Sequence, residues 1–268
     1  MHKILITGCS KGFGLLFAEY LAKSNKNFKV FATARNLQEA GDLKALKEQF
    51  NNLEILELDV LNTAHIDAII DLMAVEKIDV LINNAGYGLI GKIIDLESEA
   101  LYKQFATNVF APTELTRKLL PHFNSDGLII NISSVASYLG LPSFGAYSAS
   151  KAALNALSMS LAAENSALGL SVAVIEPGPY NTQFRESVRH LGDVSDYQQT
   201  RSKLFKTQEN AAEVAELIYK LICLKQKNKL PAYSEIPIGS NTNLLRFASR
   251  WLPLEWLVNF MISQYKSA

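Results

Sequence analysis

The apolar residues of this chain follow two alternating patterns. Short, nearly continuous runs of aliphatic residues are separated by longer segments in which apolar residues recur every three or four positions. The short runs are typical of strands in a parallel sheet covered on both faces, and the longer segments are typical of amphipathic helices. We therefore predict six buried strands, over residues 3–7, 29–34, 54–58, 78–83, 128–133 and 170–176.

The predicted helices lie between these strands and after the last of them. A seventh strand is predicted near residues 231–234, where Pro231 can stand only at the start or at a sheet edge. Repeated strand-then-helix order specifies a single-domain, Rossmann-like α/β fold, with a doubly wound parallel sheet of six to seven strands and helices on both faces. Ligands of such sheets bind beyond the carboxyl ends of the strands. The predicted helices span residues 13–23, 37–50, 63–73, 97–123, 146–168 and 211–224.

Composition and charge narrow the classes of function. The 268 residues include 26 basic and 26 acidic side chains, so no charge excess points to nucleic acid as a partner. Only two cysteines occur, Cys9 and Cys223, which argues against a disulfide framework and for a reducing, cytoplasmic location. The four histidines are scattered singly, so we expect no metal site. The chain shows neither a secretory pattern nor a run of about 18 apolar residues, and we expect a soluble protein.

A glycine-rich loop follows the first predicted strand and precedes the first predicted helix. Glycines permit a tight turn and let a pyrophosphate approach the N-terminus of the helix, where unpaired N–H groups and the helix dipole favour an anion. An ordinary turn is the alternative, but the position of the loop in an α/β pattern favours a dinucleotide site. The predicted cofactor-binding residues of the loop are Thr7, Gly8, Ser10, Lys11, Gly12, Phe13 and Gly14.

A series of short motifs follows the glycine loop at regular places along the chain. They are T-G-x-x-x-G-x-G from Thr7, then Asp59, Asn83-Asn84-Ala85-Gly86, Asn108, Ser134, Tyr147-x-x-x-Lys151 and Pro177-Gly178. In this order and spacing the sequence resembles the short-chain dehydrogenase/reductase family. The resemblance covers residues 3–182 and departs from the usual pattern at Phe13 and Tyr180.

The resemblance implies further contacts to a dinucleotide. It places Asp59 and Val60 beside the adenine, and it implies a homodimer or homotetramer. Asparagine and glycine also favour a turn after the fourth strand, and this explanation is compatible with cofactor binding. The floor of the cofactor cleft would be formed by Asn84, Ala85 and Gly86, and the segment over the nicotinamide by Pro177, Gly178 and Thr182.

The residues after the second predicted strand bear on the choice of cofactor. NAD-binding folds usually carry Asp or Glu about 20 residues past the glycine loop, where it binds the ribose hydroxyl. The corresponding stretch here reads Ala34-Arg35-Asn36. The guanidinium of Arg35 can hold a 2′-phosphate through paired hydrogen bonds, and Lys11 adds a second cation. Both could instead be solvated surface charges, but the missing acid and the agreement of two positions predict NADP(H).

Tyr147 and Lys151 form the candidate catalytic pair. They are four residues apart in an alanine-rich helical segment and therefore stand on one helical face. Such pairs also occur by chance, with the tyrosine packed and the lysine in water. A free tyrosine has a pKa near 10, and a lysine charge about 4 Å away at an effective dielectric near 20 is worth about 4 kcal/mol, at most about three pKa units. The pair therefore predicts a tyrosine that transfers protons near neutral pH.

Two further residues complete a candidate tetrad. Ser134 stands thirteen residues before Tyr147 and is expected to polarise the substrate oxygen; Ser133 is a rival, but the interval found in the family selects Ser134. The resemblance implies that Asn108 holds a water linking Lys151 to solvent and that Lys151 bonds the nicotinamide ribose, so Asn108, Tyr147 and Lys151 also border the cofactor. The implied reaction interconverts a carbonyl and an alcohol. The alternative is an NADP(H)-binding sensor or scaffold without turnover.

Three loops are expected to select the substrate, at residues 87–92, 135–144 and 179–204. Their apolar side chains suit a lipophilic aldehyde or ketone, although the same side chains could simply pack a lid. These side chains are Leu89, Leu139, Leu141, Phe144, Tyr180 and Phe184.

The last segment, residues 241–268, differs in composition from the catalytic part, residues 1–240. It is rich in leucine, phenylalanine and tryptophan, and Pro253 interrupts it, which predicts two short amphipathic helices. We expect these helices to pack over the substrate cleft or against another subunit. Peripheral contact with a membrane is the alternative, because tryptophans beside arginines suit the headgroup boundary.

Overall fold

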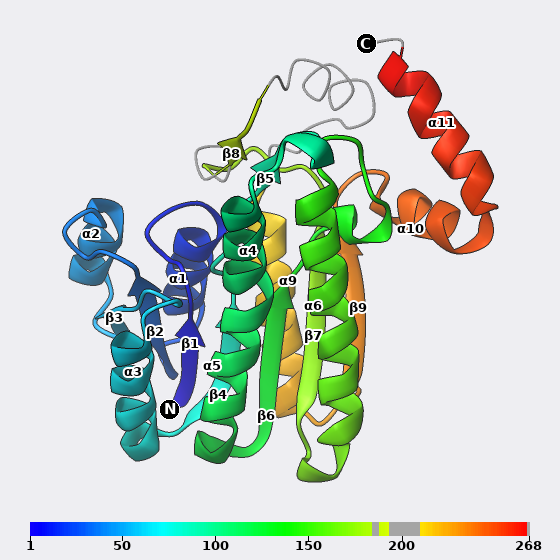
Figure 1. Ribbon diagram of the computed structural model, residues 1–268. Helices are drawn as coiled ribbons and strands as arrows, with labels where there is room; N and C mark the ends of the chain where they lie inside the picture. Colours follow the sequence, from blue (N-terminus) through cyan, green and yellow to red (C-terminus); the bar gives the residue numbers. More distant parts are fainter. Residues whose placement is uncertain (184–187, 193–209, 267–268) are drawn as a thin grey trace.

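A seven-stranded sheet forms the centre of the molecule, and each of its strands runs parallel to its neighbours (Figure 1). The computed structural model describes residues 1–183, 188–192 and 210–266. The strand order is β3-β2-β1-β4-β6-β7-β9, so the winding direction reverses between β1 and β4, as in the predicted doubly wound sheet. The strands are β1 (His2–Ile6), β2 (Phe28–Ala34), β3 (Leu53–Glu57), β4 (Ile78–Asn83), β6 (Phe123–Ile132), β7 (Ser171–Pro177) and β9 (Tyr233–Ile238), with β5 (Leu89–Ile90) and β8 (Arg189–His190) paired separately.

Helices cover both faces of the sheet because successive strand residues point to opposite sides. Ile4 and Ile6 of β1 join a core with α1, α2 and α9, whereas Leu5 joins a second core with α3, α5 and α6. The second set lies in front of the sheet in Figure 1. Burial on both faces explains why several of the strands carry nearly continuous aliphatic runs, as β4 and the second half of β6 do. These helices are α1 (Gly12–Ser24), α2 (Gly41–Gln49), α3 (Thr63–Glu76), α4 (Ser98–Phe105), α5 (Ala111–Leu119), α6 (Gly145–Glu164) and α9 (Ala212–Gln226).

Element boundaries differ from the sequence prediction in several places. The helix predicted over residues 97–123 is divided into α4, a π-helical turn η2 (Ala106–Phe110), α5 and a 3-10 turn η3 (Leu120–His122). Pro112 and Pro121 each stand in the first turn of a new piece, where a missing N–H costs little. β6 then begins at Phe123 rather than at residue 128. The remaining 3-10 turns are η1 (Ile93–Asp95), η4 (Val135–Tyr138) and η5 (Ser166–Leu168).

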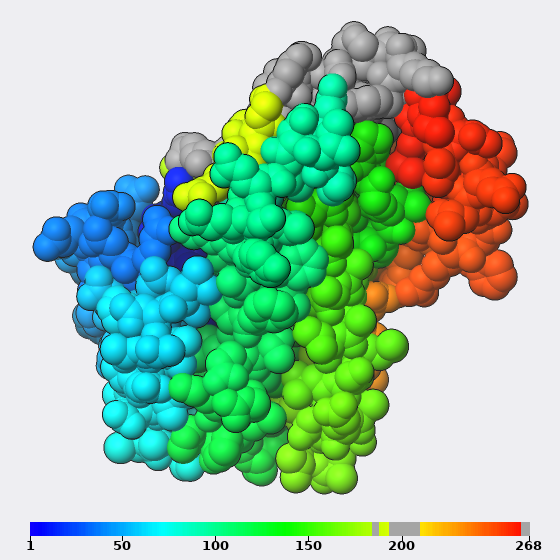
Figure 2. Space-filling model, in the orientation of Figure 1, coloured from blue at the N-terminus to red at the C-terminus, as the bar shows by residue number. Residues whose placement is uncertain are grey.

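The C-terminal segment forms two helices, α10 (Thr242–Trp251) and α11 (Leu254–Lys266), separated at Pro253. α10 lies against β9 and η4. α11 buries Leu257, whereas Trp256 remains 57% exposed. Figure 2 shows the two helices as an orange and red lobe that projects beyond the body of the molecule. Within the described residues, no helix combines the length and the apolar character needed to cross a bilayer.

Candidate active site

A cavity of about 910 Å³ opens at the carboxyl ends of the central strands. This is the position at which ligands of doubly wound sheets bind, because the winding direction reverses between β1 and β4. The cavity brings together segments that are far apart in the sequence. The predicted site residues that line it are Gly8, Ser10, Lys11, Gly12, Phe13, Arg35, Asp59, Val60, Asn84, Ala85, Gly86, Ser134, Tyr147, Lys151, Pro177, Gly178 and Thr182.

The glycine loop has the backbone that a dinucleotide requires. Gly8 and Gly12 have φ values of 72° and 61°, in the left-handed region that favours glycine. α1 begins at Gly12, and no side chain caps it at Lys11. The first N–H groups of a helix have no partner within it, and the Gly12 N–H here donates to Gln183 Oε1 at 3.4 Å. A phosphate at this end of α1 would replace that acceptor and would meet the positive end of the helix dipole. These residues fit the pyrophosphate of a dinucleotide.

Thr7 and Asn84 hold the glycine loop against the end of β4. The Thr7 hydroxyl oxygen accepts hydrogen bonds from the backbone N–H groups of Asn84 and Ala85, both at 3.0 Å. The Asn84 amide donates to the carbonyl oxygens of Thr7 and Gly8, both at 2.9 Å. Thr7 and Gly14 do not line the cavity, so they support the glycine loop rather than face the cofactor site.

Cys9 also lies in the loop but points into the core. Its side chain is fully buried, and burial raises the pKa of the thiol to about 12. The thiol therefore stays protonated at neutral pH and has the character of a packing residue.

Both cations that the sequence predicted to bind a 2′-phosphate line the cavity. Arg35 and Lys11 line it, and the loop after β2 offers no carboxylate at residues 34–36. Asp59 also lines it, and its carboxylate accepts from the N–H of Leu61 at 3.0 Å. This local bond fixes the loop after β3, as expected of an Asx turn.

Tyr147 and Lys151 stand one turn apart on α6 and both line the cavity. Their residues are only 6% and 5% exposed, and the Lys151 Nζ lies 5.8 Å from the centroid of the Tyr147 ring. Lys151 Nζ donates to the carbonyl oxygen of Ile132 at 2.8 Å. Burial lowers the pKa of Lys151 to about 8, because it penalises the charged form. The structure therefore brings the predicted pair together in a cleft.

Ser134 and Ser133 both line the cavity at the end of β6. Ser134 is the N-cap of η4, and its Oγ accepts from the N–H of Ala136 at 3.1 Å. A hydroxyl that accepts in this way keeps its own proton for donation to a substrate oxygen. The Ser133 hydroxyl instead donates to the carbonyl oxygen of Lys151 at 3.4 Å. This difference favours Ser134 for the polarising role.

Asn108 lies in the π-helical turn η2, behind the cavity wall. Its Oδ1 accepts from the N–H of Tyr87 at 3.2 Å, and its Nδ2 donates to the carbonyl oxygen of Tyr87 at 3.0 Å and to the hydroxyl oxygen of Ser150 at 3.2 Å. The side chain therefore connects the loop after β4 to α6. π-helical turns are frequent at functional sites, and this one divides the helix that the sequence predicted as continuous.

Several cavity residues were not singled out from the sequence. Lys103 and Thr107 come from α4 and η2, and His190 comes from β8. None belongs to a recognisable motif, so only the three-dimensional arrangement reveals them. Of the apolar residues predicted to select the substrate, Leu141, Phe144 and Tyr180 line the cavity, Leu89 and Leu139 do not, and Phe184 lies outside the described residues.

The two departures from the family pattern contact each other. The rings of Phe13 and Tyr180 meet edge to face, with centroids 5.6 Å apart. The Tyr180 hydroxyl donates to the Glu213 carboxylate on α9. An aromatic pair therefore joins the glycine loop to the segment after β7.

Comparison with known proteins identifies the family. The model of the short chain dehydrogenase family matches residues 2–191. An uncharacterized oxidoreductase of Bacillus subtilis, YusZ, is 36% identical over 258 residues, which cover 90% of each chain. Human 17-beta-hydroxysteroid dehydrogenase type 1 is 36% identical over 192 residues, which cover 69% of this chain and 58% of the human one.

Solved structures agree with the sequence comparison. A short-chain dehydrogenase from Streptomyces avermitilis superposes with a TM-score of 0.80 at 29% identity, covering 100% of this chain and 98% of the other. Other solved structures of this fold are complexes with NADP or with NADH. The matched family model, the YusZ relative and the shared fold together show that the chain belongs to the short-chain dehydrogenase family of oxidoreductases.

Proposed function

We propose that this protein is an NADP(H)-dependent oxidoreductase that interconverts a lipophilic aldehyde or ketone and the corresponding alcohol. The observation that carries the proposal is the burial of Tyr147 beside Lys151 in a cavity that continues to the glycine loop. The test is a panel of carbonyl compounds and alcohols followed through NADPH absorbance. Tight NADPH binding without turnover of any compound would instead support a sensor or scaffold.

Four side chains share the chemistry in this proposal. NADP(H), when bound along the cavity, supplies or accepts the hydride. Tyr147 donates its phenolic proton to the carbonyl oxygen during reduction and accepts it during oxidation. Ser134 donates a hydrogen bond to the same oxygen and so stabilises the charge that develops there. The Lys151 ammonium lowers the proton affinity of the phenol, and Asn108 holds the adjoining loop in place.

The lipophilic substrate class rests on the lining of the cavity. Ile90, Leu141, Phe144 and Val188 contribute apolar side chains to it. The human relative that this chain resembles is named for a hydroxysteroid, a lipophilic alcohol. A substrate series of increasing chain length should therefore show kcat/KM rising by about threefold to fourfold per methylene, since each buried CH₂ contributes about 0.8 kcal/mol. A flat series would exclude an apolar pocket.

Cofactor preference gives the first mutational prediction. Arg35→Ser is expected to lower kcat/KM for NADPH by about 10- to 100-fold, because a hydrogen bond to a charged group contributes about 1.5–3 kcal/mol. The value for NADH should stay within about threefold of that of the wild type. Parallel steady-state assays with both cofactors provide the measurement.

A matched control for this change is Arg117→Ser, which removes an exposed arginine of α5 that does not line the cavity. It should leave both cofactor values unchanged. Wild-type efficiency with NADH equal to or better than that with NADPH would overturn the assignment of NADP(H).

The pH dependence follows from Lys151. Burial lowers the pKa of its ammonium to about 8, so the charged form present at pH 7 is lost as the pH rises through that value. Because the ammonium activates Tyr147, kcat/KM for carbonyl reduction should fall above about pH 8, approaching tenfold per pH unit. The profile is measured at constant ionic strength with NADPH saturating at every pH, so that changes in NADPH binding do not contribute to it.

Lys151→Arg is the control for this profile, because a guanidinium does not titrate in the same range. Its turnover should be lower but should lack the decline between pH 8 and about pH 9.5. A wild-type profile that stays flat over this interval would contradict the proposed role of Lys151.

A further inference from the structure

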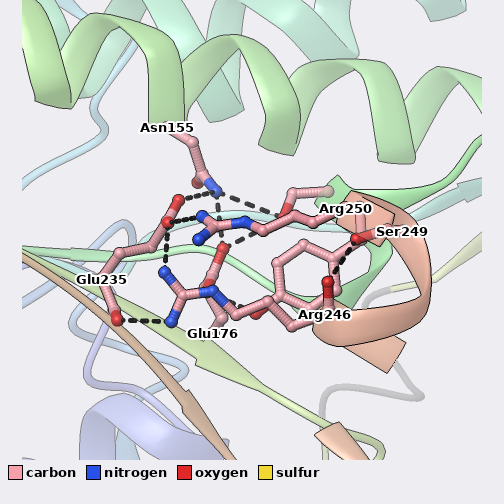
Figure 3. A network of polar contacts seen from close by, with 8 residues as sticks. Asn155, Glu176, Glu235, Arg246, Ser249 and Arg250 are labelled. Atoms are coloured by element: carbon pink, nitrogen blue, oxygen red, sulfur yellow. Dashed lines mark hydrogen bonds and ion pairs between the residues drawn. The ribbon is translucent and has the colours of Figure 1, made fainter. Parts of the chain in front are cut away.

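A cluster of polar side chains, with the fully buried Glu176 at its centre, lies where α6, η4, β7, β9 and α10 meet. Figure 3 shows its labelled members, with Asn155 and two arginines of α10 gathered around the carboxylates of Glu176 and Glu235. None of these residues lines the cavity of the candidate active site. The proposed reaction therefore leaves the cluster unexplained.

Glu176 is the centre of this cluster. Its residue is 0% exposed, and it stands in β7 directly before Pro177, which lines the cavity. Its Oε1 accepts from the Ser137 hydroxyl at 3.2 Å and from Asn155 Nδ2 at 2.7 Å. Its Oε2 accepts from the Tyr138 hydroxyl. A buried carboxylate with three donors is a rigid attachment point, because each lost bond leaves a desolvated group unpaired.

The three donors connect Glu176 to the turn that follows Ser134 and to the helix that carries Tyr147 and Lys151. Ser137 and Tyr138 belong to η4, the single turn whose N-cap is Ser134. Asn155 follows Tyr147 and Lys151 on α6 at intervals of four residues, so the three side chains share one helical face. Glu176 therefore bonds the turn that carries the serine and the helix that carries the tyrosine.

α10, the first of the two helices in the C-terminal segment, completes the cluster. Arg246 pairs with the Glu235 carboxylate at 2.6 Å and also donates to the Glu235 carbonyl oxygen at 2.9 Å. Arg250 pairs with the same carboxylate at 2.7 Å. Asn155 bridges the two acids, because its Nδ2 also lies 3.3 Å from Glu235 Oε1. Burial raises the pKa of Glu176, and the hydrogen bond from Tyr138 is the largest effect that opposes this rise.

We propose that Glu176 positions Ser134 against Tyr147 through Ser137, Tyr138 and Asn155, and that Arg246 and Arg250 of α10 stabilise this arrangement. The inference rests on the proposed function and deepens it. According to this inference, residues outside the cavity position the groups that react. Some of these residues belong to the C-terminal segment. A small displacement of η4 would move the donor of the substrate hydrogen bond without altering the cofactor surface.

The first experiment changes Tyr138 to Phe, which removes one bond to Glu176 and keeps the ring. We expect kcat to fall by about tenfold, with the Kd for NADPH, measured by fluorescence titration, within twofold of the wild type. Tyr102→Phe, which alters an exposed tyrosine of α4, is the matched control and should leave kcat unchanged. Ser137→Ala removes a different donor and should act in the same direction.

A double-mutant cycle separates positioning from a general loss of stability. In a Ser134→Ala background, Tyr138→Phe should lower kcat by less than twofold, because the hydroxyl that it positions is already absent. An undiminished tenfold loss in that background would overturn the inference. So would normal kcat for both Tyr138→Phe and Ser137→Ala.

The α10 part is tested with the double variant Arg246→Gln, Arg250→Gln in the full chain. It should lower kcat by about tenfold with unchanged NADPH Kd, and the loss should again disappear in the Ser134→Ala background. Arg117→Gln is the control for loss of a helical arginine. Unchanged kcat in the double variant would overturn the role of α10. Wild-type protein without NADPH-linked turnover would overturn the proposed function itself, and with it the inference, so the two failures are distinguishable.

Discussion

Tyr147→Phe is expected to lower kcat by about 1,000-fold while leaving the Kd for NADPH within about twofold, because proton transfer by a positioned side chain contributes about 10² to 10⁴ in rate. The change removes only the hydroxyl. The ring remains packed against Phe144, whose centroid lies 4.5 Å away. Thermal stability should therefore change little, and a loss of turnover would be chemical rather than structural. Single-turnover assays with saturating NADPH provide the rate.

Lys151→Met is a second, independent test of the Tyr147–Lys151 pair. It should lower kcat to a similar degree, because the phenol loses the ammonium beside it. Burial of the Lys151 ammonium is unfavourable and has lowered its pKa to about 8. Replacing it with an apolar side chain should therefore lower the free energy of unfolding less than the loss of another buried polar group would. Near-normal turnover by Tyr147→Phe would exclude the tyrosine mechanism regardless of the result for Lys151.

The fold was predictable because its sheet is buried on both faces. β1 and β4 contribute aliphatic residues to both cores, so their periodicity leaves no polar face to obscure the strand signal. The long helix over residues 97–123 was not correctly divided, because apolar spacing continues through η2 into α5. Pro112 and Pro121 were the only signals of these divisions that the sequence offered. A proline is common in the first turn of a helix, but it shows that a helix begins there only if the previous helix is known to end just before it.

Only those residues of the candidate site that belong to sequence motifs were predictable. The glycine loop, Tyr147 and Lys151 have fixed spacings in the chain, and the structure places them around one cavity. No spacing reports that Glu176 meets Tyr138, or that Arg246 reaches Glu235, because these contacts join separate elements. Nor could the sequence distinguish residues that line the cavity from Thr7, Gly14 and Asn108, which lie behind its wall.

Gly14→Ala is expected to lower the free energy of unfolding by about 3 kcal/mol and to weaken NADPH binding by at least about 100-fold, at the upper end of overpacking effects. Gly14 does not need a left-handed backbone; it needs space. A Cβ at this position would lie 2.1 Å from the carbonyl oxygen of Gly8 and 2.6 Å from the side-chain nitrogen of Asn84. Both atoms belong to the bonded unit that joins the ends of β1 and β4, so neither can move away alone.

Gly41→Ala is the matched control for that change, because Gly41 is the first residue of α2 and a Cβ there meets nothing within 4 Å. It should leave NADPH binding unchanged and raise stability by up to about 1 kcal/mol, since alanine loses less backbone entropy than glycine. Denaturant unfolding and NADPH titration of both variants give the comparison. A free energy of unfolding for Gly14→Ala within about 0.5 kcal/mol of the wild-type value would contradict this prediction. It would show that α1 can move away from the loop after β4. The glycine loop would then be an adaptable turn rather than a rigid cradle for the pyrophosphate.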